Sequence, residues 1–196
     1  MGTDDRAAPM NGRATGRRGF LTFAAATLTA MAVPALVPAA PAMAAPLAGG
    51  VRRIALHNVN TNESFSGVYW ADGAYKADAL RKLDVLLRDH RAKQVCRFDP
   101  RLFDLLARVH QAVGSDEPFR IVCGYRSKRT NAMAQRRSRG VAKQSYHTRG
   151  MAVDLRLPDV DLGAIADQAV ELGLGGVGYY PRSGFVHLDS GPVRSW

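Results

Sequence analysis

Residues 145–157, Ser-Tyr-His-Thr-Arg-Gly-Met-Ala-Val-Asp-Leu-Arg-Leu, place a histidine, a glycine and an aspartate within ten positions. From Met151 onward, apolar residues alternate with others at the period of two that is typical of a β-strand. Asp154 therefore lies on one face, opposite the apolar residues at positions 151, 153, 155 and 157. Gly150 permits a close turn before the strand, so His147 and Asp154 can point at one spot.

A second stretch, Phe185-Val186-His187-Leu188-Asp189, shows the same alternation, with His187 and Asp189 on one face. If this strand pairs beside the first, His187 joins His147 and Asp154. Two imidazoles and one carboxylate leave a coordination position open, which is typical of a catalytic rather than a structural zinc site. Zinc in such a site makes water a usable nucleophile near neutral pH.

These residues also have a simpler interpretation without a metal. A strand histidine can be a surface or hydrogen-bonded residue, and Asp154 can pair with Arg149 or Arg156. The other three histidines lack a comparable context, and we interpret them as structural or solvated: His57, His90 and His110.

The rest of the chain predicts alternating short strands and helices. Strands are expected at 52–59 and 65–70 as a hairpin, and at 119–123, 151–157, 177–180 and 185–188. Helices are expected at 76–91, 100–113, 127–137 and 162–172, the second with Asp99 as its N-cap and Gly114 as its end. The pattern predicts an α+β fold: a small, mostly antiparallel sheet flanked by helices, with the zinc site on the sheet face.

Residues 1–44 are predicted to be a twin-arginine signal peptide. Gly16-Arg17-Arg18-Gly19-Phe20-Leu21 precedes an apolar run to Pro41, and Ala42-Met43-Ala44 fits a cleavage site. A membrane-spanning helix needs roughly 20 apolar residues, whereas Pro34 interrupts this run early. We therefore expect export to the periplasm or beyond, and no stable membrane insertion after cleavage.

Residues 45–196 are predicted to form a single domain. Four of the 27 Lys and Arg and two of the 17 Asp and Glu precede residue 45, which leaves 23 against 15, a net charge of +8. An exported basic protein tends to meet polyanions such as cell-wall polymer, and nucleic acid is not an expected partner outside the cytoplasm. Cys96 and Cys123 can form a disulfide or remain small buried thiols.

The stretch from Ser145 to Asp154 matches S-x-H-x-x-G-x-A-x-D at every fixed position. It resembles the signature of zinc peptidases related to D-alanyl-D-alanine carboxypeptidases and VanX dipeptidases. Gly124-Tyr125-Arg126-Ser127 is similar to an element of the same families, and residues 176–196 resemble the YcbK/MepK group of murein endopeptidases.

The resemblance implies zinc ligands at His147, Asp154 and His187. It implies that Arg126 binds substrate or stabilises the oxyanion, where a fixed cation assists peptide hydrolysis. Ser145 would contact substrate or steady the ligand loop. The implied activity is cleavage of peptide bonds in peptidoglycan cross-links, with endopeptidase action favoured over carboxypeptidase action.

One position departs from the family pattern. VanX-like members have a glutamate three residues before the last histidine as general base, and Gly184 stands there in this chain. Asp189 is the expected replacement, either as the base or as a residue that orients His187. The missing glutamate leaves a second hypothesis open, a zinc-containing peptidoglycan-binding module without hydrolysis.

Overall fold

The computed structural model describes residues 50–138 and 142–196. The predicted signal peptide, residues 1–44, lies outside them. No helix among the described residues is long and apolar enough to cross a bilayer.

Eight strands form one sheet in the order β3-β2-β1-β4-β5-β7-β6-β8. The strands are β1 (Val51–Asn58), β2 (Glu63–Ala71), β3 (Ala74–Tyr75), β4 (Phe119–Cys123), β5 (Ala152–Arg156), β6 (Gly176–Tyr180), β7 (Phe185–Asp189) and β8 (Arg194–Ser195). The helices are α1 (Ala77–Leu86), α2 (Pro100–Val113), α3 (Lys128–Arg137) and α4 (Leu162–Leu172), with short 3-10 turns η1 (Tyr146–Arg149) and η2 (Pro181–Ser183). The α+β class is confirmed.

The prediction of a small, mostly antiparallel sheet needs correction, because the sheet has eight strands and is mixed. β1 pairs with β4 in parallel, and β6 pairs with β8 in parallel. Strand β4 can run parallel to β1 because the long connection through α1 and α2 returns the chain to the end of the sheet at which β1 begins. Alternation along a strand predicts its faces, but the direction of its neighbour depends on such connections.

The helix that follows the hairpin ends at Leu86 and not at Arg91 as predicted. Asp89 accounts for the early end. Its Oδ1 accepts hydrogen bonds from the backbone N–H groups of Arg91 and Ala92, both at 3.0 Å, and its Oδ2 accepts one from the Ser127 N–H at 2.9 Å. These bonds offer the backbone an alternative to a further helical turn, and they attach this loop to the start of α3.

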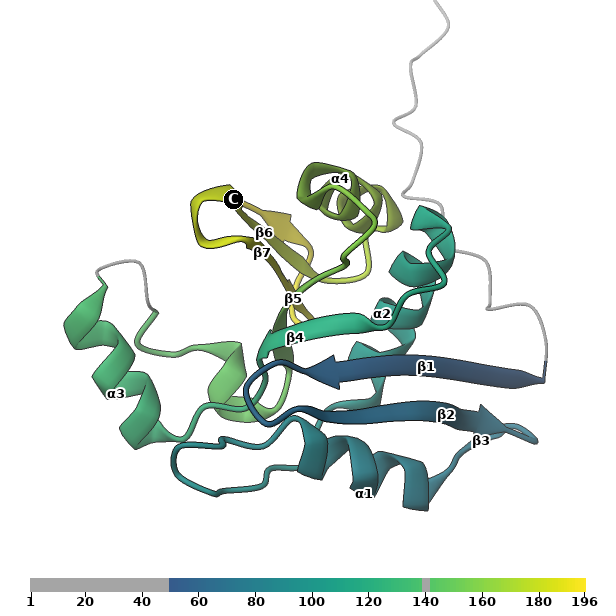
Figure 1. Ribbon diagram of the computed structural model, residues 1–196, viewed down its shortest axis with the longest axis horizontal. Coiled ribbons are helices and arrows are strands. Elements are labelled where there is room, and N and C mark those ends of the chain that lie inside the picture. The colour runs from purple at the N-terminus through teal and green to yellow at the C-terminus, as the bar shows by residue number, and fades with distance from the viewer. Residues whose placement is uncertain (1–49, 139–141) are drawn as a thin grey trace, which may run out of the picture. The chain divides into compact units, whose positions relative to one another are not determined.

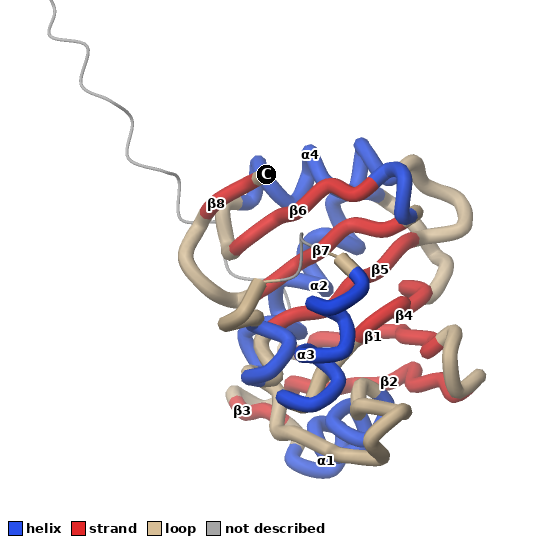
Figure 2. The backbone as a smooth tube through the Cα atoms, turned by 90° about the vertical axis from the view of Figure 1, so that its left-hand side faces the viewer, coloured by secondary structure: helices blue, strands red, loops and turns tan. Residues whose placement is uncertain are grey.

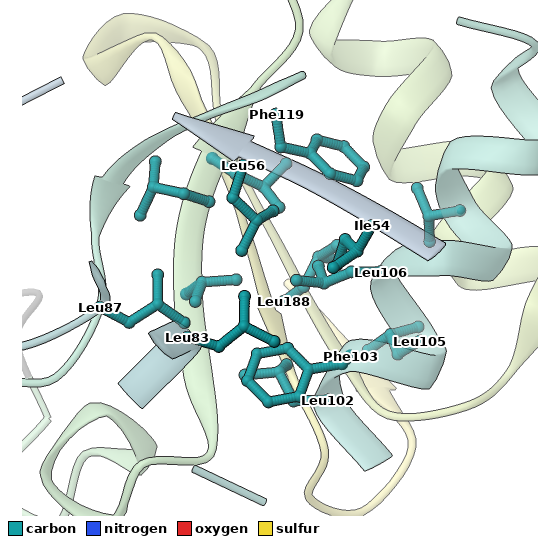
Figure 3. Packing of buried hydrophobic residues seen from close by; sticks show 14 of the residues in the cluster. Ile54, Leu56, Leu83, Leu87, Leu102, Phe103, Leu105, Leu106, Phe119 and Leu188 are labelled. Atoms are coloured by element: carbon teal, nitrogen blue, oxygen red, sulfur yellow. The ribbon is translucent and has the colours of Figure 1, made fainter. Parts of the chain in front are cut away.

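Helices α1, α2 and α4 pack on one face of the sheet and share one core (Figure 3). Leu83 of α1, Leu102 of α2 and Ile165 of α4 are fully buried there with Leu155 and Leu188 from the central strands. The other face is not covered in this way. Figure 1 shows α3 beyond the carboxyl end of β4, and Figure 2 shows α3 on the opposite side of the sheet from α2 and α4. The site lies on this second face.

Candidate metal centre

Strands β5 and β7 are neighbours, and their register places Asp154 directly opposite His187. We expected a shared site on the condition that these two strands pair, and the pairing is confirmed. On both strands the alternate residues Val153, Leu155 and Val186 enter the core, so Asp154 and His187 project from the other face.

His147 reaches the same point from η1. The Ser145 side chain accepts a hydrogen bond from the His147 backbone N–H at 3.4 Å and caps this turn. Gly150 ends the turn in the left-handed conformation, with φ of 67°. The chain then enters β5, so His147 on the turn and Asp154 on the strand lie close together.

Gly150 has no room for a side chain. A Cβ there would lie 2.4 Å from the Arg97 carbonyl oxygen, whereas a Cβ at Gly114, which has the same φ of 67°, would meet nothing within 4 Å. We expect Gly114→Ala to lower the free energy of unfolding by about 1 kcal/mol, the cost of the left-handed backbone alone. Gly150→Ala should cost roughly 3 kcal/mol, because the steric clash adds to that strain.

Urea unfolding of both variants in metal-free buffer measures this difference. Equal losses of stability in the two variants would show that the close approach to Arg97 does not constrain the turn.

Three atoms that could bind a metal ion form a nearly equilateral triangle, called here the donor triangle. Nε2 of His147 lies 3.1 Å from Oδ1 of Asp154 and 3.1 Å from Nδ1 of His187, and the Asp154 and His187 atoms are 2.9 Å apart. Four donors arranged as a tetrahedron at about 2.0 Å from a zinc ion would be about 3.3 Å apart. The spacing therefore suits one face of such a tetrahedron.

Neighbouring groups fix which nitrogen of each imidazole is free. Nδ1 of His147 donates to the Gly124 carbonyl at 2.7 Å, and Nε2 of His187 donates to Oδ2 of Asp189 at 3.0 Å. With both rings neutral, the other two nitrogens and Oδ1 of Asp154 are all acceptors that face one another. A cation at their centre removes the repulsion, so this donor set fits a metal ion.

The pKa of each of the three residues depends on its burial and on the charges of its neighbours. Burial would raise the pKa of Asp154, but the two histidines hold it well below its usual range. Burial lowers the pKa of His147. For His187, burial acts downward, but Asp154 and Asp189 raise its pKa overall. His147 is therefore held neutral and Asp154 ionised, the forms in which these residues bind a metal ion.

Cys123 is a neighbour of this cluster that sequence reasoning did not include. It pairs with Asp154 across β4 and β5, and its Sγ belongs to a group with His147 and Asp154 whose ligand atoms lie within 4.8 Å of one another. Burial raises its pKa to about 12, which keeps the thiol neutral. Both cysteines are free thiols, so the structure contains no Cys96–Cys123 disulfide. Only knowledge of the β4–β5 register could have placed Cys123 here.

Asp189 contacts the nitrogen of His187 that points away from the other two donors. Its carboxylate is fully buried and also accepts from Arg194, at 2.6 Å to Oδ2 and 3.1 Å to Oδ1. The Arg194 guanidinium in turn lies over the rings of Tyr146 and Trp196, 4.9 and 4.8 Å from their centroids. Burial would raise the pKa of Asp189, but His187 and Arg194 lower it to about 2, so the carboxylate is ionised.

A cleft of about 440 Å³ opens over the cluster. Arg126, Ser145, Asp154 and His187 line it, together with three aromatic residues: Tyr180, Phe185 and Trp196. Arg126 Nη2 donates to Ser145 Oγ at 3.3 Å, while its buried Nε has no hydrogen-bond partner among the described residues. Four of the six sequence-predicted site residues thus line one cleft, whereas His147 and Asp189 are fully buried and contact Asp154 and His187 from behind.

A comparison with known families matches residues 46–196 to the family described as peptidoglycan L,D-endopeptidase MepK. The chain belongs to the MepK family.

Curated members of this family are similar over most of their length. A probable peptidoglycan L,D-endopeptidase MepK of Haemophilus influenzae (strain KW20 / Rd) is 44% identical over 146 residues, which is 74% of this chain and 78% of the relative. Peptidoglycan L,D-endopeptidase MepK of Escherichia coli (strain K12) is 40% identical over 180 residues, 92% of this chain and 96% of the relative. The family resemblance inferred from residues 145–154 and 176–196 is confirmed.

Proposed function

We propose that this protein is a peptidoglycan L,D-endopeptidase that hydrolyses cross-links between stem peptides with the help of a bound zinc ion. The observation that carries the proposal is the triangle of three acceptor atoms from His147, Asp154 and His187 at the floor of the cleft. The names of the MepK relatives support the substrate and the L,D bond.

Zinc suits the proposed ligands, since two neutral imidazoles and one carboxylate are ligands of catalytic zinc sites. When bound, zinc would polarise the scissile carbonyl and lower the pKa of a coordinated water. His147 and His187 would hold it through the nitrogens that Gly124 and Asp189 leave unprotonated.

Other residues of the cleft would stabilise charge and hold the substrate and the zinc ligands in place. Arg126 places a permanent positive charge in the cleft beside Asp154 and His187, where it can stabilise negative charge that develops on the carbonyl oxygen. Ser145 holds both Arg126 and the turn that bears His147. Trp196 donates a hydrogen bond from Nε1 to the Tyr180 hydroxyl at 2.6 Å, and its ring lies 5.4 Å from that of His187, so these two aromatic residues would flank the bound substrate.

For Asp189 the geometry supports a positioning role over that of a general base. Its carboxylate is occupied by His187, Arg194 and the Gly191 N–H, and it meets His187 on the side remote from the donor triangle. We therefore propose that Asp189 keeps the proton on Nε2 of His187, so that Nδ1 remains available to the metal.

Asp189→Asn is expected to weaken zinc binding by about 10- to 100-fold, because an amide is a poorer acceptor for the imidazole N–H. Activity should recover to within about fivefold of wild type when zinc is saturating, since the chemistry does not require this carboxylate. Competition with a chromogenic chelator measures the affinity, and exposed Asp167→Asn is the matched control. Unchanged zinc affinity with lost turnover would instead assign Asp189 as the general base.

The second hypothesis, a binding module without hydrolysis, arose from Gly184 at the position of the family glutamate. Gly184 ends η2 at a φ of 71° and has no side chain to act as a base. The two similar relatives are nevertheless named as endopeptidases, so the enzymatic function is the better supported one.

Activity on peptidoglycan requires a location outside the cytoplasm. We propose that residues 1–44 direct the protein there through the twin-arginine pathway, on the evidence of Arg17-Arg18 and the cleavage site at Ala42-Met43-Ala44.

Digestion of purified muropeptide dimers tests the proposed function. With zinc, a dimer joined by an L,D bond should yield monomers, a chelator should stop the reaction, and added zinc should restore it. The proposal fails if this dimer stays intact under conditions in which the protein retains zinc.

A further inference from the structure

The positive charge of this protein is concentrated in one segment. Residues 118–153 contain nine Lys or Arg and no Asp or Glu. Residues 45–117 and 154–196 together contain 14 Lys or Arg and 15 Asp or Glu. The net charge of +8 after residue 44 therefore comes from this segment alone, and the remainder is close to neutral.

Helix α3 presents much of this charge to solvent. Lys128, Arg129, Arg136 and Arg137 are all exposed, and none of them forms an ion pair within the described residues. Only Thr130 and Asn131 of α3 are buried. The helix therefore contributes little to the core, and its exposed face is a cationic surface.

The cations at the start of α3 do not stabilise the helix. Lys128 and Arg129 stand in the first turn of α3, where the helix dipole disfavours positive charge, and no acidic residue stands there. Acidic residues at these positions would stabilise an exposed helix better. The dipole favours Arg136 and Arg137 in the last turn, so helix stability accounts for those two cations but not for the pair in the first turn.

Both ends of α3 meet the cleft. Arg126, just before the helix, and Ser138, just after it, line the cleft together with Ala142 and Gln144, and exposed Lys143 stands between the last two. Figure 2 shows α3 in front of the sheet. A polymer whose cross-link enters the cleft can therefore extend beside this helix.

We infer that α3 and the described residues on either side of it, Arg126 and Lys143, form a docking surface for the free carboxylates of peptidoglycan stem peptides next to the bond in the cleft. The inference rests on the proposed function and adds how the insoluble polymer is held. Unpaired cations beside a cleft raise the local concentration of an anionic substrate. An anionic membrane is the weaker candidate, because α3 lacks the apolar face with which interfacial helices insert.

The test compares a triple variant of α3, Lys128→Gln, Arg129→Gln and Arg136→Gln, with a control triple of exposed cations elsewhere, Arg53→Gln, Lys82→Gln and Arg97→Gln. Co-sedimentation of metal-free protein with intact sacculi measures binding without digestion. The α3 triple should bind about tenfold more weakly than wild type at low salt and respond less to added salt. The control triple should keep wild-type affinity and salt response.

Two further measurements identify the ligand. Sacculi whose carboxylates have been converted to amides should bind wild type no better than untreated sacculi bind the α3 triple. With zinc and a saturating concentration of a small soluble dimer, both triples should reach a kcat within about twofold of wild type, because the replaced residues lie outside the cleft lining and act on binding.

Equal binding of both triples to sacculi would overturn the inference, as would undiminished binding of wild type to amidated sacculi. Stronger binding to vesicles of anionic lipid than to sacculi would assign the surface to a membrane instead. These outcomes are separate from failure of the proposed function, because the sedimentation uses metal-free protein and requires no catalysis. Loss of fold is not expected, since removing cations from the first turn of α3 relieves an unfavourable interaction with its dipole.

Discussion

Asp154→Asn is expected to reduce cleavage of an L,D-linked muropeptide dimer by roughly a thousandfold or more. The asparagine removes the negative ligand from the donor triangle, and with it the metal that supplies several kcal/mol of transition-state stabilisation, where each 1.36 kcal/mol is tenfold in rate. Metal analysis of the purified variant should find zinc far below that of wild type. Exposed Asp167→Asn, which makes the same chemical change outside the site, should alter neither quantity.

The same variant makes an opposite prediction for the metal-free protein. The new amide N–H can donate to Nε2 of His147 or Nδ1 of His187, which lie 3.1 and 2.9 Å from the replaced oxygen. The metal-free variant should therefore unfold at a temperature no lower than metal-free wild type, while zinc should raise the Tm of wild type only. A zinc-dependent rise in the Tm of the variant, equal to that of wild type, would show that Asp154 is not a ligand.

Arg126→Gln is expected to lower kcat by about 10²- to 10³-fold, the effect of removing one preorganised group that stabilises an oxyanion. Zinc content should be unchanged, because Arg126 contacts the Ser145 side chain and the backbone of His147 without contacting any proposed ligand atom. Steady-state kinetics on the soluble dimer, at saturating zinc, separate kcat from KM.

The exposed Arg53→Gln on β1 is the control for a lost cation. Arg126→Lys should recover only part of kcat, since a lysine keeps the charge but not the planar set of donors. A rise in KM with unchanged kcat would mean that Arg126 binds the ground state of the substrate and has no special role in the transition state.

Much of the local structure was predictable, because each element depends on short-range patterns. Helix α2 begins after Asp99, whose side chain accepts from the Arg101 N–H at 3.0 Å, and it ends at Gly114 in the left-handed conformation, as predicted. The capping of α3 by Ser127 is likewise confirmed. The early end of α1 was not predictable, because it depends on a hydrogen bond between Asp89 and Ser127, 38 positions away.

The site residues likewise divide into those that a local pattern predicted and those that it did not. Alternation within β5 and β7 assigned His187 and Asp154 to the strand faces away from the core before any pairing was known. The roles of Cys123 and Arg194 were not evident, because neither follows from periodicity. Cys123 is placed by the β4–β5 register, and Arg194 by the return of the chain after β7, which brings its guanidinium to Asp189.

The sequence by itself determined the elements, the faces of the strands and the resemblance to murein endopeptidases, since these depend on residue order over ten or twenty positions. Only the tertiary structure decided that the sheet is mixed, that the three proposed ligands meet within 3.1 Å, and that Asp189 stands behind His187. It also decided that the residues at both ends of the cationic helix α3, Arg126 and Ser138, line the cleft. The physical reason is that such contacts join residues far apart in the chain, and their geometry is set by strand pairing and core packing, which no local pattern encodes.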